Sequence, residues 1–121
     1  TYQPCSPAVE QAARLLLCLG ETREPEMSLT GICKKIGIHK SKGFSILNAL
    51  AKHDLVIKDS RSKTYSLGPA LMPLAEKARE KLNINNIAKT YLQNLANETK
   101  TSVLLGIINN DQFYIAAKYD G

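Results

Sequence analysis

The sequence has little of what membrane, secreted and metal-binding proteins need. No apolar run approaches the ~20 residues of a membrane helix, and residues 1–7 carry neither the basic nor the apolar segment of a secretory signal. The three cysteines, Cys5, Cys18 and Cys33, cannot all pair within one chain, and none lies in a CxxC or at zinc-like spacing from a histidine. We therefore expect a cytoplasmic protein with reduced thiols, no metal and no membrane contact.

Signals of catalysis are equally scarce. The two histidines, His39 and His53, fall at a predicted turn and a predicted helix end, where surface or capping roles are typical. Neither has a serine or cysteine nucleophile assigned beside it, and the sequence holds no glycine-rich phosphate loop or paired-carboxylate motif. We expect no catalytic or cofactor-binding residue, no cofactor, and therefore no enzyme.

What the sequence does have is enough apolar material for a core and a concentrated positive charge. Hydrophobic residues make up 44% and charged residues 22% of 121 residues, which is typical of a globular chain, and the formal charge is +5. Residues 28–64 hold eight basic and two acidic residues, whereas residues 1–27 hold two and four and residues 65–121 hold six and five. Such a charged stretch is often only a solvated surface, so the elements that carry it decide its meaning.

The hydrophobic spacing predicts an amphipathic helix from Pro7 to Gly20. Leu15 and Cys18 fall outside its apolar stripe, either as ordinary surface or as a subunit contact. The residues of that stripe are Val9, Ala12, Ala13, Leu16 and Leu19.

Two further helices are predicted on either side of a short turn. The second is capped by Ser28 and ends at Gly37, with Cys33 as a small core residue, and the third runs from about Lys40 to His53. At 100° per residue, the apolar face of the third helix comprises Gly43, Ile46, Leu47 and Leu50. The opposite face is centred on Ser41, Ser45, Asn48 and Lys52 and flanked by Lys42 and Phe44.

Two β-like runs, 55–58 and 64–67, follow the third helix and predict a hairpin with a basic tip. Three helices followed by a hairpin is the order of a winged helix, and the spacing around Gly37 is that of a helix-turn-helix. The third helix is then able to lie in a DNA major groove, with Ser41, Ser45 and Asn48 at base edges. Lys58, Arg61 and Lys63 are placed to reach backbone phosphates.

Alternatives remain open at this point for single residues. Each polar residue of the third helix, taken alone, fits an ordinary solvent-facing position. An exposed Phe44 fits contact with a thymine methyl group, and it equally fits packing against the first helix or the hairpin.

The second half of the chain predicts a linker helix and the beginning of another domain. The linker helix starts near Pro73 and is interrupted at 83–86, and the next helix ends by Thr99. Strands 101–108 and 112–118 then form a hairpin around 109–111, where the residues tolerate the positive φ of a tight turn. One helix and two strands do not close a stable domain, so we expect the chain to be a piece of a longer protein.

The run from Ser28 to Lys42, the pair Leu47 and Leu50, and the motif Tyr65-Ser66-Leu67-Gly68 together resemble the IclR family of bacterial transcription regulators. Segments 92–95, 98–99 and 103–106 resemble the opening helix and strand of that family's effector-binding domain. The resemblance implies an α+β chain: a winged helix-turn-helix DNA-binding domain over 1–68, a linker helix over 69–84, and the truncated start of an α/β effector-binding domain over 85–121.

The resemblance also implies a homodimer or tetramer that binds double-stranded operator DNA at a promoter, as a repressor or an activator, under control of a small-molecule effector. The family's effector pocket lies mostly beyond Gly121, so no effector-binding residue is assigned and effector control is expected of the full-length protein only. By matching position, Lys40 joins the recognition helix. The predicted DNA-binding residues are Lys40, Ser41, Lys42, Phe44, Ser45, Asn48, Lys52, Lys58, Arg61 and Lys63.

The rival function is a winged-helix protein-interaction module whose basic segment meets an acidic partner surface. Steep salt dependence with DNA of mixed sequence, plus a sequence-specific increment, distinguishes a DNA-binding protein from this alternative.

Overall fold

The computed structural model describes residues 6–82 and 86–121, which form two compact units, one up to Leu74 and one from Ala75 to Gly121. Cys5 and most of the predicted interruption at 83–86 lie outside the described residues, as does the predicted end of the linker helix at residue 84. No helix of the described residues is long and apolar enough to cross a membrane.

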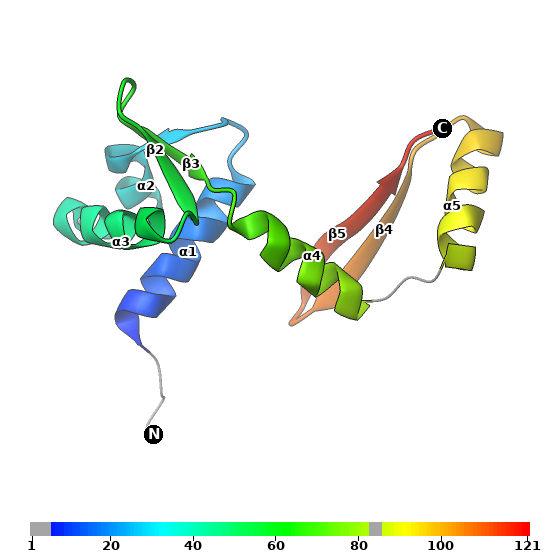
Figure 1. Ribbon diagram of the computed structural model, residues 1–121, viewed down its shortest axis with the longest axis horizontal. Coiled ribbons are helices and arrows are strands. Elements are labelled where there is room, and N and C mark those ends of the chain that lie inside the picture. The colour runs from blue at the N-terminus through cyan, green and yellow to red at the C-terminus, as the bar shows by residue number, and fades with distance from the viewer. Residues whose placement is uncertain (1–5, 83–85) are drawn as a thin grey trace. The chain divides into compact units, whose positions relative to one another are not determined.

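The first unit contains three helices and a three-stranded antiparallel sheet (Figure 1). The helices are α1 (Pro7–Glu21), α2 (Leu29–Ile36) and α3 (Lys40–Lys52), and the strands are β1 (Met27–Ser28), β2 (Val56–Asp59) and β3 (Thr64–Leu67). The sheet order is β1-β3-β2, so β3 is the central strand. The three helices and the hairpin are confirmed, whereas β1 was missed, because two residues are too few to show an alternating pattern.

The core of the first unit draws on all three helices and the sheet. Its most enclosed large side chains are Leu15, Ile32, Leu47 and Val56, from α1, α2, α3 and β2. On α3 the buried residues are Gly43, Ile46, Leu47 and Leu50. These are the predicted residues, so the phase of the third helix is confirmed.

The predicted phase of α1 is only partly correct: Leu19 is buried and Ala12 and Leu16 pack against the core as predicted, but the core also takes in two residues placed outside the stripe. Leu15 is 0% exposed and Cys18 is 5% exposed, whereas Val9 is 67% exposed. Residues 15–19 are all apolar and surround the whole helix, so their periodicity cannot show which side faces the core. Packing against α2 and α3 buries Leu15 and Cys18, which therefore are neither ordinary surface nor a subunit contact, and leaves Leu17 exposed.

Helix α4 (Leu71–Leu82) spans the boundary between the two units and begins two residues before Pro73, earlier than predicted. The backbone N–H of Leu71 donates to the Gly68 carbonyl, and that of Met72 donates to the Pro69 carbonyl. Proline therefore occupies the third helical position, where an N–H has no partner within the helix and its loss is tolerated.

The second unit also holds α5 (Asn86–Thr99) and a hairpin of β4 (Val103–Asn109) with β5 (Gln112–Tyr119). Asn110 and Asp111 have φ of 51° and 61° and form a two-residue turn, one residue shorter than the predicted 109–111, because Asn109 pairs with Gln112 at the end of the ladder. The ladder shifts register in mid-strand: Leu105 faces Ala117 and Gly106 faces Ile115, so Ala116 forms a bulge. The Ala116 carbonyl accepts a hydrogen bond from Arg79 Nη1 of α4 at 2.6 Å.

Candidate nucleic-acid interface

The joint between α2 and α3 fixes the position of the candidate recognition helix. Ser28 caps α2 by accepting a hydrogen bond from the Gly31 N–H at 3.1 Å, and Gly37 ends it with φ 73°. The Gly37 and Ile38 N–H groups both donate to the Cys33 carbonyl, at 2.9 and 3.1 Å. Residues other than glycine rarely adopt this positive φ. The glycine at position 37 therefore specifies the turn between the two helices.

Helices α2 and α3 are in close contact at Gly43. A Cβ atom at this position would overlap the sulfur of Cys33, so only glycine permits the observed approach. Cys33 is 3% exposed, as expected of a core residue. Burial raises the pKa of its thiol, with the charge of Lys40 acting in the opposite direction, so the buried sulfur stays protonated at neutral pH.

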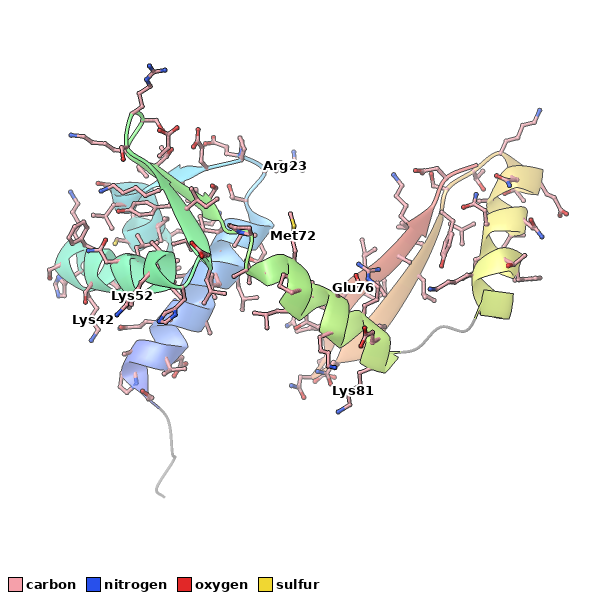
Figure 2. All side chains as sticks on the ribbon, viewed as in Figure 1. Arg23, Lys42, Lys52, Met72, Glu76 and Lys81 are labelled. Atoms are coloured by element: carbon pink, nitrogen blue, oxygen red, sulfur yellow. The ribbon has the colours of Figure 1, made fainter. Side chains whose placement is uncertain are left out.

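The outer face of α3 is exposed along its length. Lys40, Ser41, Lys42, Phe44, Ser45, Asn48 and Lys52 are all exposed. Figure 2 shows Lys42 and Lys52 extending from the same side of α3 in that view. This face offers hydroxyl, amide and ammonium groups, which are the groups that contact base edges and phosphates.

The wing, defined here as β2, β3 and the loop between them, has an ordered tip. Asp59 Oδ1 accepts a hydrogen bond from the Arg61 N–H at 3.0 Å, and the Asp59 carbonyl accepts from the Lys63 N–H at 2.7 Å. Lys63 has φ 56°, which closes the loop. The side chains of Lys58, Arg61 and Lys63 are all exposed.

A hydrogen-bond chain that the sequence did not reveal fastens the wing to the loop before β1. Thr64 Oγ1 donates to Glu26 Oε2 at 2.6 Å, and Ser62 Oγ lies 2.6 Å from Thr64 Oγ1. Because the Thr64 hydroxyl donates to the carboxylate, Ser62 is the donor to Thr64. Glu26 and Thr64 are far apart in sequence, so no local pattern signals this link.

Lys58 connects the wing to α3. Its Nζ lies 5.6 Å from the centroid of the Phe44 ring and 5.8 Å from that of Tyr65. Phe44, which the sequence left between a DNA contact and internal packing, therefore packs beside the wing while 44% of its surface stays exposed.

The cations of this surface keep their charge unpaired. Among the described residues, the ion pairs lie within 76–120, so none involves a predicted DNA-binding residue. The described part of the chain also holds no cluster of three or more histidine, cysteine or acidic residues that could bind a metal.

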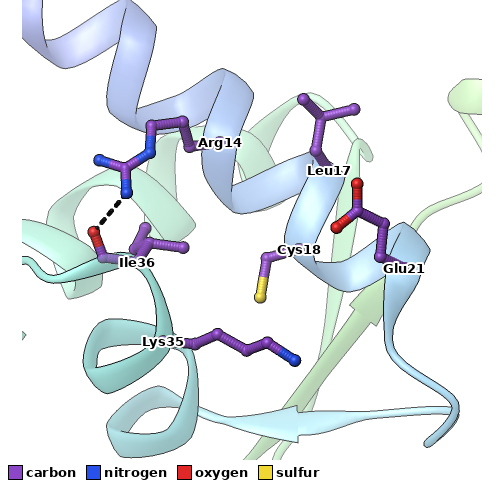
Figure 3. A pocket seen from close by; sticks show the side chains of 6 residues that line it. All are labelled: Arg14, Leu17, Cys18, Glu21, Lys35 and Ile36. Atoms are coloured by element: carbon purple, nitrogen blue, oxygen red, sulfur yellow. Dashed lines mark hydrogen bonds between the residues drawn. The ribbon is translucent and has the colours of Figure 1, made fainter. Parts of the chain in front are cut away.

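Arg14 links α1 to the end of α2, a contact that the sequence did not indicate. Its Nη2 donates to the Ile36 carbonyl at 2.8 Å and so satisfies the carboxyl end of α2 (Figure 3). It borders a hollow of about 330 Å³ whose other lining residues are Leu17, Cys18, Glu21, Lys35 and Ile36. None of the predicted DNA-binding residues lines this hollow.

Comparison with known proteins identifies the fold and the family. The family model described as the IclR helix-turn-helix domain matches residues 8–60, from α1 to the wing. The HTH-type transcriptional regulator TtgV of Pseudomonas putida (strain DOT-T1E) is 32% identical over 107 residues, which are 88% of this chain and 40% of TtgV. The chain belongs to the IclR family.

Solved structures of IclR regulators have the same fold as this chain. The IclR regulator from Alicyclobacillus acidocaldarius is 30% identical with a TM-score of 0.75, and the match covers 97% of this chain and 46% of that one. An IclR homolog complexed with 4-hydroxybenzoate, from Microbacterium hydrocarbonoxydans, is 10% identical with a TM-score of 0.73, over 93% and 46% of the two chains, which shows a common fold. The chain thus spans less than half the length of these relatives. The IclR family consists of transcription regulators and not of enzymes, as the sequence predicts.

Proposed function

We propose that this IclR-family chain binds double-stranded operator DNA at a promoter and acts there as a repressor or an activator. The observation that carries the proposal is the contact between Lys58 and Phe44, in which the Lys58 Nζ lies 5.6 Å from the centroid of the Phe44 ring. This contact makes α3 and the wing one continuous surface, so the exposed residues predicted from two separate segments stand on adjoining elements.

In the proposed complex, α3 occupies the major groove and the wing follows the phosphate backbone. Ser41, Ser45 and Asn48 face base edges, and Asn48 has the amide that pairs with adenine through two hydrogen bonds. The phosphates are contacted by Lys40, Lys42 and Lys52 of α3 and by Arg61 and Lys63 of the wing.

For the whole protein we propose a cytoplasmic homodimer or tetramer controlled by a small-molecule effector. Residues 1–68 then form the DNA-binding domain, residues 69–84 the linker helix, and residues 85–121 the start of the effector-binding domain. The 4-hydroxybenzoate complex of the Microbacterium homolog supports small-molecule control. For a dimer with two-fold symmetry we expect an operator that has two half-sites related by the same symmetry.

The test begins with selection of bound sequences from random DNA, followed by affinity measurements across a range of salt concentrations. Replacing Ser45 and Asn48 by alanine is expected to reduce the preference for the selected operator by about 5-fold to 150-fold, and to leave non-specific affinity nearly unchanged. Replacing Arg61 and Lys63 by alanine is expected to weaken binding to all sequences and to reduce the salt slope by up to about two.

The matched control replaces Lys81 and Lys89 by alanine, which removes the same charge from exposed positions of α4 and α5. Its salt slope should equal that of the unmodified chain. If no DNA sequence is enriched and affinity for mixed DNA is insensitive to salt, the proposal is refuted and the protein-interaction alternative is favoured.

A further inference from the structure

We infer that Phe44 and Lys58 are positioning residues that hold the wing against the recognition helix, and that the Lys58 ammonium serves this contact and not a DNA phosphate. The inference rests on the proposed function and changes the role of two of its residues. We call Phe44, Lys58 and Tyr65 the wing clamp.

The wing clamp joins three elements through one ammonium group. Lys58 Nζ lies 5.6 Å from the Phe44 centroid and 5.8 Å from the Tyr65 centroid, and both distances fall within the ~6 Å over which a cation is attracted to an aromatic ring. Lys58 and Tyr65 are direct cross-strand partners in the β2–β3 ladder. Tyr65 is 2% exposed, so one ring of the clamp is fixed in the core, and the other comes from α3.

The strand that carries Tyr65 is also paired along its other edge, with β1. Met27 of β1 faces Tyr65 across the β1–β3 ladder, and Ser28, the cap of α2, faces Thr64. The strand that carries the fixed ring is therefore tied to the start of the helix-turn-helix. Lys58 then links β2, the outer strand of the wing, to Phe44 on α3.

The placement of Lys58 sets it apart from the cations at the tip. Arg61 and Lys63 lie in the loop, beyond the strands, whereas Lys58 lies within β2 with its charge between two rings. An ammonium group that moves away from the rings toward a phosphate gives up the attraction of both rings. Loss of the clamp frees the wing to take other orientations, and the apparent affinity falls with the fraction of molecules in the binding-competent one.

Three variants test the clamp by operator affinity and salt slope. Phe44→Leu keeps an apolar side chain without the aromatic ring, Lys58→Met keeps the stem without the charge, and the third variant combines them. Each single change is expected to weaken operator binding by about twofold to thirtyfold, the range of cation–π contacts, with the salt slope unchanged. The double variant is expected to lose no more operator affinity than the single variant that binds more weakly, because both changes break the same contact.

The matched control is Lys63→Met, which removes one cation from the tip and should lower the salt slope by ~0.9. If Lys58→Met lowers the slope by the same amount and its effect multiplies with that of Phe44→Leu, Lys58 is a phosphate contact and the clamp is refuted. If Phe44→Leu changes the selected base preference while Lys58→Met does not, Phe44 is a base contact, which also refutes the clamp.

A measurement on the free chain separates the clamp from the proposed function. Protons next to the Lys58 Nζ lie near two aromatic rings, so their NMR signals should be shifted by ring currents, and Phe44→Leu should remove part of that shift. A shift that Phe44→Leu leaves unaltered overturns the inference even if the chain binds DNA. Absence of DNA binding by the unmodified chain, with the shift behaving as expected, overturns the proposed function and leaves the contact established.

Discussion

Replacing Gly43 by alanine is expected to destabilise the first unit, although alanine is the better helix former. The helix-propensity gain is about 1 kcal/mol, whereas overpacking of a well-packed core costs about 1 to 3 kcal/mol. The added methyl group would overlap the Cys33 sulfur, while the Leu29 and Ile38 Cδ1 atoms, at 3.4 and 3.5 Å, would be close to ordinary van der Waals contact. We expect a net loss of up to about 2 kcal/mol in the free energy of unfolding.

The cause of this loss can be isolated by removing the sulfur. Cys33→Ala alone should cost about 1 kcal/mol, since it leaves a small gap between α2 and α3. In that background Gly43→Ala has room for its methyl group and should be stabilising by up to about 1 kcal/mol. The two substitutions should therefore show a coupling free energy of about 1 to 3 kcal/mol, equal to the cost of the overlap.

Urea unfolding followed by far-ultraviolet circular dichroism measures all four proteins of this cycle, with the midpoint moving at constant slope. Equal effects of Gly43→Ala in the presence and absence of the Cys33 sulfur would refute the proposed overlap. A stabilising Gly43→Ala in the otherwise unmodified chain would do the same.

Two further substitutions test the packing of the first unit. Leu15→Ala should lower the free energy of unfolding by about 2 to 5 kcal/mol, whereas Leu17→Ala, at a 57% exposed position of the same helix, should change it by less than about 0.5 kcal/mol. Thermal unfolding compares the two, and equal losses would contradict the observed phase of α1. Gly68→Ala would bring a Cβ atom against the backbone carbonyl of Asp54, which cannot rotate away as a side chain can, so its loss should exceed that of Gly43→Ala in the urea assay. A smaller loss would show that the Asp54 backbone yields easily.

The helix-turn-helix was predictable because its signals are local. Ser28, Gly37 and Gly43 each perform a task that depends on residues close in sequence or on the adjoining helix, and α3 has one apolar stripe with a polar opposite face. Its phase, and hence the exposure of Asn48, followed from the helical period alone. The glycine of the motif Tyr65-Ser66-Leu67-Gly68, which supports the resemblance to the IclR family, also has a physical basis. The Asp54 backbone leaves no room for a side chain at this position.

The contacts that organise the site were not predictable in the same way. The Glu26–Thr64 hydrogen bond and the placement of Lys58 beside Phe44 join elements that meet only after the chain has folded. The sequence showed a cation in a strand and an aromatic residue on a helix, and nothing in either pattern indicates that they meet. The same limit explains why the burial of Leu15 on α1 was not predicted, since it is determined by tertiary packing and not by the periodicity of the helix.

The bulge at Ala116 bears on how this hairpin can change length. Ile115 faces Gly106 and Ala117 faces Leu105, so Ala116 is one residue more than a regular ladder needs. A chain lacking this residue keeps every other strand pair, and what it loses is the carbonyl that accepts the Arg79 side chain. We therefore expect natural length variation of the hairpin to fall at this position, and the arginine of α4 to be exchanged freely in chains that carry the shorter strand.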